Sequence, residues 1–394
     1  ILYPPPVTPE DTPSVPHTFT EAMNDPLWVP AIQKEVQTFL DANALAPYTP
    51  VEGELRFLTS FWIFVIKADG TRKARLIIIC PDELKSKKVT ASSPVVKQTT
   101  VLSLLTRHMQ HSGHTLTSYD VKGTFLNTPV DDKKFYRLKT PKGFQAYFSD
   151  KYVTIQKQVY GLKESPMGFY LYARRQLLSS FQTWHSDSCL LVDKADPTTA
   201  CVSHVDDFLV TSAKRTTIED SLGPKFELKR QDLPRLYIGY ELHYSDDSIL
   251  LSTGDYISAL VETLPEVLKS TIKRGARHPL TTDFTDAAST ALTNVTAAGY
   301  LDKPIDQTLY RKLVGIIQYV ASKTRFDVQF AGSFLSRYNH SPTPQVLNQA
   351  IQTLKYIYST RDSGYKIMRS PASSSQLDIY TDASFNIRAS DNLM

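Results

Sequence analysis

Adjacent aspartates are the residues in this sequence best suited to chemistry with a metal ion. Asp206-Asp207 is enclosed by apolar residues on both sides, in CVSHVDDFLVTS. Two carboxylates at the ends of buried strands repel each other, and a hard divalent cation such as Mg²⁺ relieves that repulsion. Two other pairs lie in polar surroundings typical of turns, Asp131-Asp132 and Asp246-Asp247.

Asp120 has the same character as the enclosed pair. It closes the apolar run of TLTSYDVKGTFL and is followed directly by Val121-Lys122-Gly123. A strand-end aspartate together with a pair at a hairpin tip forms the set needed to hold two metal ions ~4 Å apart, which would clamp both oxygens of an in-line phosphoryl displacement. On these residues alone, the commoner interpretation is that of ordinary buried or turn aspartates.

The elements that would position these acids are of mixed type. Apolar runs at 61–66 and 74–79 around Ala68-Asp69-Gly70 predict a hairpin, and two more hairpins are predicted around Asp206-Asp207 and residues 245–247. Residues 114–121 and QLDIYTDASF near the C-terminus predict single strands, and 281–294 a loop. Helical spacing appears in residues 19–40, 95–109, 165–181, 310–322, 326–338 and 345–358. The pattern predicts an α+β protein of several subdomains.

Composition narrows the class of protein. Apolar residues make up 41% and charged residues 21% of the 394-residue chain, which excludes a disordered or fibrous protein. Residues 61–90 hold seven basic and three acidic residues, an excess equal to the whole net charge of +4. That stretch suits a surface facing a polyanion, although on charge alone a solvated lysine-rich loop is the favoured interpretation.

Cysteine and histidine spacing predicts neither disulfides nor a zinc site. Cys80, Cys189 and Cys201 show no CxxC spacing, which favours a reduced intracellular protein. Residues 108, 111 and 114 are histidines, but they straddle a helix end, so a shared zinc geometry is not expected. No apolar run approaches the ~20 residues of a membrane span. The segment ILYPPPVTPEDTPSVP predicts an extended linker cut from a longer chain.

A series of segments, in order from about Phe19 to Phe385, resembles the reverse transcriptases of copia-type LTR retrotransposons. They are KARLIII, SSPVVKQTTV, SYDVKGTFLNTPVDDKKFY, VYGLKESPMGFY, HVDDFLV and YRKLVGIIQYVASKTRFDV. The resemblance implies a right-hand polymerase: a Pro-rich linker at 1–18, fingers and palm at 19–245 (palm mainly 106–127 and 165–245), and a helical thumb and connection at 246–375. Residues 376–394 resemble the truncated start of an RNase H-like domain, with Asp382 as its first ligand, so RNase H activity is not expected.

The resemblance also assigns roles to residues. Asp120, Asp206 and Asp207 are the implied catalytic residues, and Asp120, Val121, Asp206 and Asp207 the implied ligands of two Mg²⁺ ions, for which Mn²⁺ would substitute. Nucleotide binding is implied for Lys73, Arg75, Phe125, Gly161 and Lys163, and a primer grip for Ile238, Gly239 and Tyr240. Phe125 would lie beneath the sugar and exclude a ribose 2′-hydroxyl. Without the resemblance, Phe125 as core, Gly161 as a turn glycine and Tyr240 as sheet packing are simpler interpretations.

Several positions depart from the family's pattern. They are Cys80-Pro81, Thr124, Thr128, Glu164, Met167, Phe169, His204 and Phe326. All three implied catalytic carboxylates are kept, which favours an active enzyme. A decayed or repurposed copy that binds nucleic acid or takes part in assembly is the alternative.

The resemblance implies partners and a location as well. Expected partners are an RNA template, a DNA primer–template duplex and deoxynucleoside triphosphates, with no membrane. A cytoplasmic retrotransposon particle is the expected location, and the nucleus is the alternative. The oligomeric state stays open between monomer and homodimer.

Overall fold

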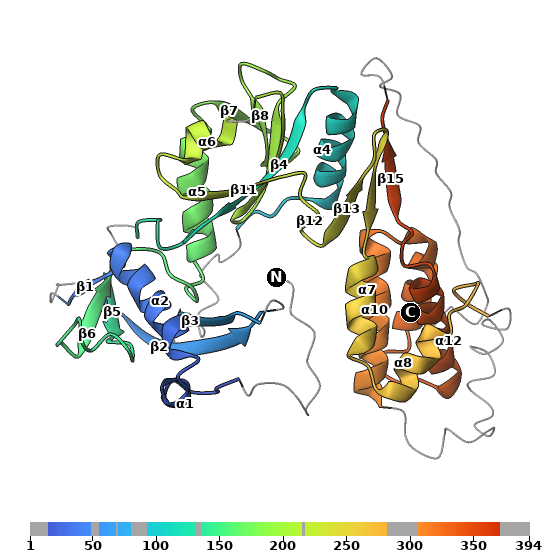
Figure 1. The fold of residues 1–394 in the computed structure, drawn as a ribbon, viewed down its shortest axis with the longest axis horizontal. Helices are drawn as coiled ribbons and strands as arrows, with labels where there is room; N and C mark the ends of the chain where they lie inside the picture. Colours follow the sequence, from blue (N-terminus) through green and yellow to red (C-terminus); the bar gives the residue numbers. More distant parts are fainter. Residues whose placement is uncertain are drawn as a thin grey trace.

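The computed structural model describes residues 15–48, 55–67, 70–79, 93–130, 135–214, 217–281 and 306–370. They form three bodies in an arch, each with its own β-sheet (Figure 1). The predicted α+β class is confirmed. Predictions for the N-terminal linker before residue 15, Cys80-Pro81, Asp131-Asp132, most of the 281–294 loop and the RNase H-like segment with Asp382 lie outside the described residues.

The first body is a five-stranded sheet covered by helices. Its strand order is β1 (Leu45–Pro47), β6 (Tyr152–Ile155), β5 (Phe135–Lys139), β2 (Leu55–Ile66) and β3 (Arg72–Ile79). The predicted β2–β3 hairpin is confirmed. The helical pattern at 19–40 forms two helices, α1 (Phe19–Asn24) and α2 (Val29–Asp41). Asp25 is extended because it precedes Pro26, and this conformation ends α1.

The second body is a six-stranded sheet with helices on both faces. Its order is β11 (Leu228–Asp232), β4 (Thr115–Val121), β10 (Asp207–Ser212), β9 (Ala200–His204), β8 (Asp187–Asp193) and β7 (Phe181–Trp184). Helix α4 (Gln98–Gln110) packs Leu104 and Leu105 on one face. On the other face Phe169, from α5 (Ser165–Leu177), lies in one core with α6 (Thr217–Leu222). Since side chains alternate along a strand, β4 supplies Leu116 to the first core and Tyr119 to the second.

The third body joins a four-stranded sheet to a helical bundle. The strands are β12 (Leu236–Tyr237), β13 (Tyr240–Tyr244), β14 (Ser248–Ser252) and β15 (Tyr365–Met368). The helices are α7 (Gly254–Glu262), α8 (Glu266–Lys273), α10 (Gln307–Lys323), η1 (Phe326–Val328), α11 (Gln329–Ser336) and α12 (Pro344–Ser359). The sequence patterns did not predict β15. Arg325 is 3% exposed and pairs with Asp327 while also binding Thr360, which ties the end of α10 to the end of α12.

Within the described residues, none of the helices combines the length and the apolar character that crossing a bilayer requires.

Candidate active site

The Asp206-Asp207 pair lies where the sequence predicts, at the tip of the β9–β10 hairpin. Val205 and Asp206 form the connecting turn, hereafter the aspartate turn, in which Val205 has a left-handed φ of 56°. A β-branched residue is rarely found in that region, so the hairpin holds the turn under backbone strain. The turn is also fastened to the neighbouring strand, because the Val121 N–H donates to the Asp206 carbonyl at 3.1 Å.

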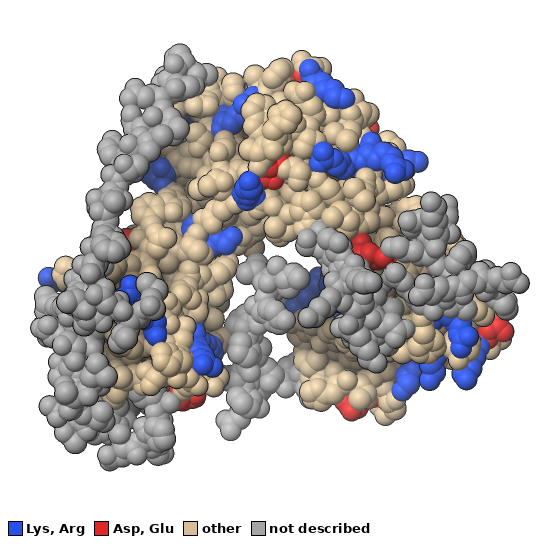
Figure 2. Space-filling view, turned by 180° about the vertical axis from the view of Figure 1, so that it is seen from behind, with Lys and Arg blue, Asp and Glu red and all other residues tan. Residues whose placement is uncertain are grey.

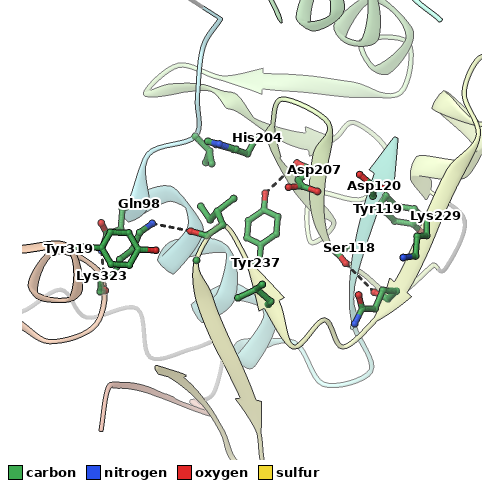
Figure 3. Close-up of a pocket in the computed structure, with 15 residues that line it drawn as sticks. Gln98, Ser118, Tyr119, Asp120, His204, Asp207, Lys229, Tyr237, Tyr319 and Lys323 are labelled. Carbon is green, nitrogen blue, oxygen red and sulfur yellow. Dashed lines mark hydrogen bonds between the residues drawn. The ribbon is translucent and has the colours of Figure 1, made fainter. Parts of the chain in front are cut away.

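Strand register places four polar side chains in one line, hereafter the cross-strand row. Asp207 of β10 lies opposite both His204 of β9 and Asp120 of β4, and Asp120 lies opposite Lys229 of β11. Residues directly opposite each other in antiparallel strands point to the same face of the sheet. All four line one cleft of about 690 Å³, together with Ser118, Tyr237 and Lys323 (Figure 3).

The acids of this site repel one another. Burial raises the pKa of Asp207 to about 6, and the negative charges of Asp206 and Asp120 add to the effect. Burial also raises the pKa of Asp206, with Asp120 adding to it and Arg75 opposing it. A cation would relieve this repulsion. However, in the part of the chain that the structure describes, no three His, Cys, Asp or Glu side chains already converge as a metal site.

Thr124 and Thr128, two departures from the family's pattern, are both buried and hydrogen-bonded. The Thr124 hydroxyl donates to the Val121 carbonyl at 2.7 Å, and the Thr128 hydroxyl donates to the Thr124 carbonyl at 3.0 Å. A carbonyl oxygen has two lone pairs, so the bond from Thr124 leaves Val121 one acceptor site for a further ligand.

Comparisons with known proteins identify the family of the chain. The family described as "Reverse transcriptase (RNA-dependent DNA polymerase)" matches residues 51–271, more than half of the chain.

The chain belongs to this family.

Relatives narrow the assignment to copia-type retrotransposons. The retrovirus-related Pol polyprotein of transposon RE1 from Arabidopsis thaliana is 27% identical over 94% of this chain. The Ty1-BL Gag-Pol polyprotein of Saccharomyces cerevisiae is 23% identical over 78%. The matches span 25% and 18% of those relatives, so this reverse transcriptase chain corresponds to only part of each polyprotein.

The residues predicted to bind nucleotide form a contact chain between the first two bodies of this reverse transcriptase. The Arg75 guanidinium lies 4.7 Å from the centre of the Tyr160 ring, and that ring meets Phe125 edge-on at 4.9 Å. Lys73 is on the same strand as Arg75. Burial and the charge of Arg75 lower the pKa of Lys73, while Asp120 is close enough to oppose the shift.

Gly161 is required by close backbone packing. Its φ is 103°, and a Cβ there would lie 2.1 Å from the Ile78 carbonyl oxygen. The Ile78 N–H donates to the Tyr160 carbonyl at 2.8 Å, so this turn is fixed to strand β3. Lys163 lies two residues further on, partly buried. Glu164, another departure, accepts a hydrogen bond from the Tyr136 hydroxyl.

Ile238 and Gly239 form a second strained turn, hereafter the grip turn, which lines the same cleft as Asp207. Their φ angles are 39° and 87°. The neighbouring Tyr237 hydroxyl donates to the Asp207 carbonyl at 3.5 Å (Figure 3). Ile238 and Gly239 therefore share a cleft with Asp120 and Asp207, whereas Tyr240 is fully buried and does not line it.

Sequence reasoning missed Lys229, Tyr160 and Lys323 as parts of this region. Lys229 reaches the cross-strand row only through the β4–β11 register, which local sequence does not reveal. The signal for Tyr160 was its position next to Gly161.

The three histidines at 108, 111 and 114 contact one another and strand β10. His111 and His114 stack at 5.0 Å, and His108 and His114 both contact the Thr211 hydroxyl, at 3.2 and 3.4 Å. Burial and the charge of His114 lower the pKa of His108 to about 4, so His108 is neutral at physiological pH.

Proposed function

We propose that this chain catalyses DNA synthesis on RNA and DNA templates, adding deoxynucleotides to a primer 3′-hydroxyl during retrotransposon replication. The observation that carries the proposal is the cleft shared by Asp207, Asp120 and the grip turn, in a chain of reverse transcriptase family. Acids that attract metal and a turn that can touch a primer end are the two parts nucleotidyl transfer requires.

The three bodies support a right-hand architecture of fingers, palm, and thumb with connection. The five-stranded body corresponds to the fingers, the six-stranded body to the palm and the helical body to the thumb and connection (Figure 1). Helix α4 packs Leu104 and Leu105 into one core with the six-stranded sheet. The same core contains Tyr237, Tyr240 and Leu242 of β12 and β13, which supports a palm that extends to about residue 245, as the resemblance implies.

Asp120, Asp206, Asp207 and the Val121 carbonyl supply the hard oxygen ligands that suit Mg²⁺, or Mn²⁺ in its place. Burial is the main cause of the raised pKa values of Asp206 and Asp207, and neighbouring carboxylates add to it; a divalent cation would offset both effects. When bound, two such ions activate the attacking hydroxyl and stabilise the leaving oxygen. The chain's own part is to hold these carboxylates on one sheet face and to keep the grip turn beside them.

The contact chain between fingers and palm would position the nucleotide. Lys73 and Arg75 offer charge-assisted hydrogen bonds to a triphosphate. Phe125, held edge-on by Tyr160, would lie beneath the sugar and exclude a 2′-hydroxyl. Gly161 and Lys163 would line the pocket, and Ile238, Gly239 and Tyr240 would hold the primer end.

Basic side chains are spread over the face opposite that of Figure 1, on each of the three bodies, and acidic ones are fewer among the described residues visible there (Figure 2). A nucleic acid lying across the arch would meet cations on every body. Such phosphate contacts would make binding sensitive to salt.

A non-catalytic nucleic-acid-binding or assembly protein is the second candidate. It draws support from His204, whose Nδ1 is buried without a hydrogen-bond partner among the described residues at a position facing the cleft.

Primer extension separates the two candidates. The template is poly(rA)–oligo(dT) with Mg²⁺ or Mn²⁺, and the wild-type chain is compared with the double variant Asp206→Asn/Asp207→Asn. Extension by the wild type alone supports the polymerase. A folded wild type that binds the duplex but extends nothing would favour the binding protein, and reverting Thr124 and His204 to the family's residues would then be the next step.

A further inference from the structure

The grip turn is strained and carries no charge of its own. A left-handed φ in the β-branched Ile238 is unfavourable, so neighbouring contacts must hold it. Gly239 lies so near helix α10 that a Cβ would come within 2.5 Å of the Tyr319 hydroxyl oxygen. This helix is assigned to the thumb, and its Lys323 lies 85 positions from Ile238 in the sequence.

Lys323, in the last turn of α10, contacts the grip turn directly. Its Nζ donates to the Ile238 carbonyl at 3.0 Å and lies 4.7 Å from the centre of the Tyr240 ring (Figure 3). The ammonium therefore contacts the residues on both sides of Gly239. The side chain is partly buried, and burial lowers its pKa.

The backbone that carries Lys323 is itself fixed to the palm and the four-stranded sheet. The Gln98 side-chain amide, from α4, donates to the carbonyls of Ser322 at 2.6 Å and Lys323 at 3.2 Å. The Thr324 hydroxyl meets that of Thr253 at 3.0 Å. Both ends of Lys323 are thus held, its backbone by the palm and its ammonium by the grip turn.

We propose that Lys323 is a positioning residue that latches thumb helix α10 to the grip turn and thereby sets where the primer 3′ end lies relative to Asp120 and Asp207. The inference rests on the proposed function, since only a primer-extending enzyme needs that placement. Through this contact, the position of the primer end depends on the orientation of the thumb relative to the palm.

Direct binding of a backbone phosphate by Lys323 is a different role with a different signature. An ammonium has three donors, and the Ile238 carbonyl takes one of them. Losing a phosphate contact weakens duplex binding and lowers the salt slope by about one. Losing a latch leaves duplex affinity nearly unchanged and slows chemistry, because small misplacement of reacting atoms can cost ~10²-fold.

The test compares Lys323→Met and Lys323→Arg with the wild type, using the full chain and poly(rA)–oligo(dT) with Mg²⁺. Lys312→Met is the matched control, because Lys312 is an exposed lysine on the same helix. We expect Lys323→Met to lower kcat by about 10-fold or more, with duplex Kd and its salt slope little changed. Lys323→Arg should recover part of kcat, and Lys312→Met should match the wild type.

Hydrogen exchange supplies a readout without activity. Backbone amides in residues 236–241 should exchange faster in Lys323→Met than in the wild type, while helices distant from α10 stay protected. Unchanged kcat and exchange would overturn the latch, and so would a lowered salt slope with unchanged kcat. If the wild type does not extend primers at all, the proposed function fails, while the exchange comparison still decides whether Lys323 holds the turn.

Discussion

Two strained turns lie beside the candidate active site, and different contacts hold them. The aspartate turn contains Asp206 and lies at a hairpin tip of the six-stranded sheet, where the Val121 N–H binds its backbone. The grip turn contains no charged group, and Lys323 and Tyr319 of helix α10 lie against it. The candidate carboxylates therefore belong to one sheet, whereas the grip turn depends on a helix distant in sequence.

The largest expected effect comes from removing a carboxylate of the cross-strand row. Asp207→Asn and Asp120→Asn should each lower primer extension by ~10³-fold or more, because metal assistance accounts for several kcal/mol of barrier. Steady-state extension measures this loss. Asp246→Asn, at an exposed turn outside the cleft, is the control. Retention of near wild-type rates in Asp207→Asn would refute the assignment of Asp207 to metal binding.

The function of the grip turn should depend on its backbone conformation, because the turn contains no charged side chain. Gly239→Ala adds a Cβ at a φ of 87° and 2.5 Å from the Tyr319 hydroxyl oxygen, so we expect a loss of about 1–3 kcal/mol in the free energy of unfolding. A kcat reduction of about 10-fold should accompany it, since either the turn or the Tyr319 ring must move.

Gly315→Ala is the control for that variant. Gly315 lies in α10 with open space around it, and alanine there should be neutral or stabilising by up to about 1 kcal/mol. Urea unfolding and extension assays compare the two. If Gly239→Ala behaves like Gly315→Ala, the grip turn is not under the constraint described.

The raised pKa of Asp207, the residue after the aspartate turn, predicts how stability depends on pH. The pKa of Asp207 is about 6 in the folded chain, above the ~3.9 of an unfolded aspartate, so the folded state binds its proton more tightly. Stability from that proton is fully present below about pH 4 and is lost as the pH rises through about 6. Without divalent ions, the wild type should therefore lose more stability between pH 5 and pH 7 than Asp207→Asn. Equal losses in urea unfolding would contradict the raised pKa.

The smallest effect is expected at the hydrogen bond that joins the two turns. Tyr237→Phe removes the donor to the Asp207 carbonyl, and at 3.5 Å that bond contributes at the low end of the usual ~0.5–1.5 kcal/mol. We expect kcat to fall only a few-fold with unchanged duplex affinity. A loss as large as that of Asp207→Asn would mean that Tyr237 takes a direct part in catalysis.

Local pattern predicted much of the fold but little of its long-range pairing. Alternating apolar runs and turn residues were enough for the β2–β3, β9–β10 and β13–β14 hairpins, because both strands of each lie together in sequence. The parallel pairing of β2 with β5 and the addition of β15 to β14 join distant segments, and nothing local encodes them.

The same limit applies to the candidate site. Asp120 and Asp207 carry a signal in their apolar flanks, and the family resemblance named them. Lys229 enters the cross-strand row only through register, and Lys323 through the packing of α10. The strain at Val205 and Ile238 is likewise invisible in sequence, since both are residue types that favour extended backbone.

Strand β15 has a consequence for the order in which the chain folds during synthesis. Its partner β14 ends at Ser252, and residues 365–368 must leave the ribosome before that ladder can close. At ~5–20 residues per second, synthesis of the chain between β14 and β15 takes several seconds or more. During that time the edge of β14 that pairs with β15 has unpaired backbone groups. Exposed strand edges recruit other strands, so the nascent protein is expected to need chaperone protection during that interval, before β15 arrives.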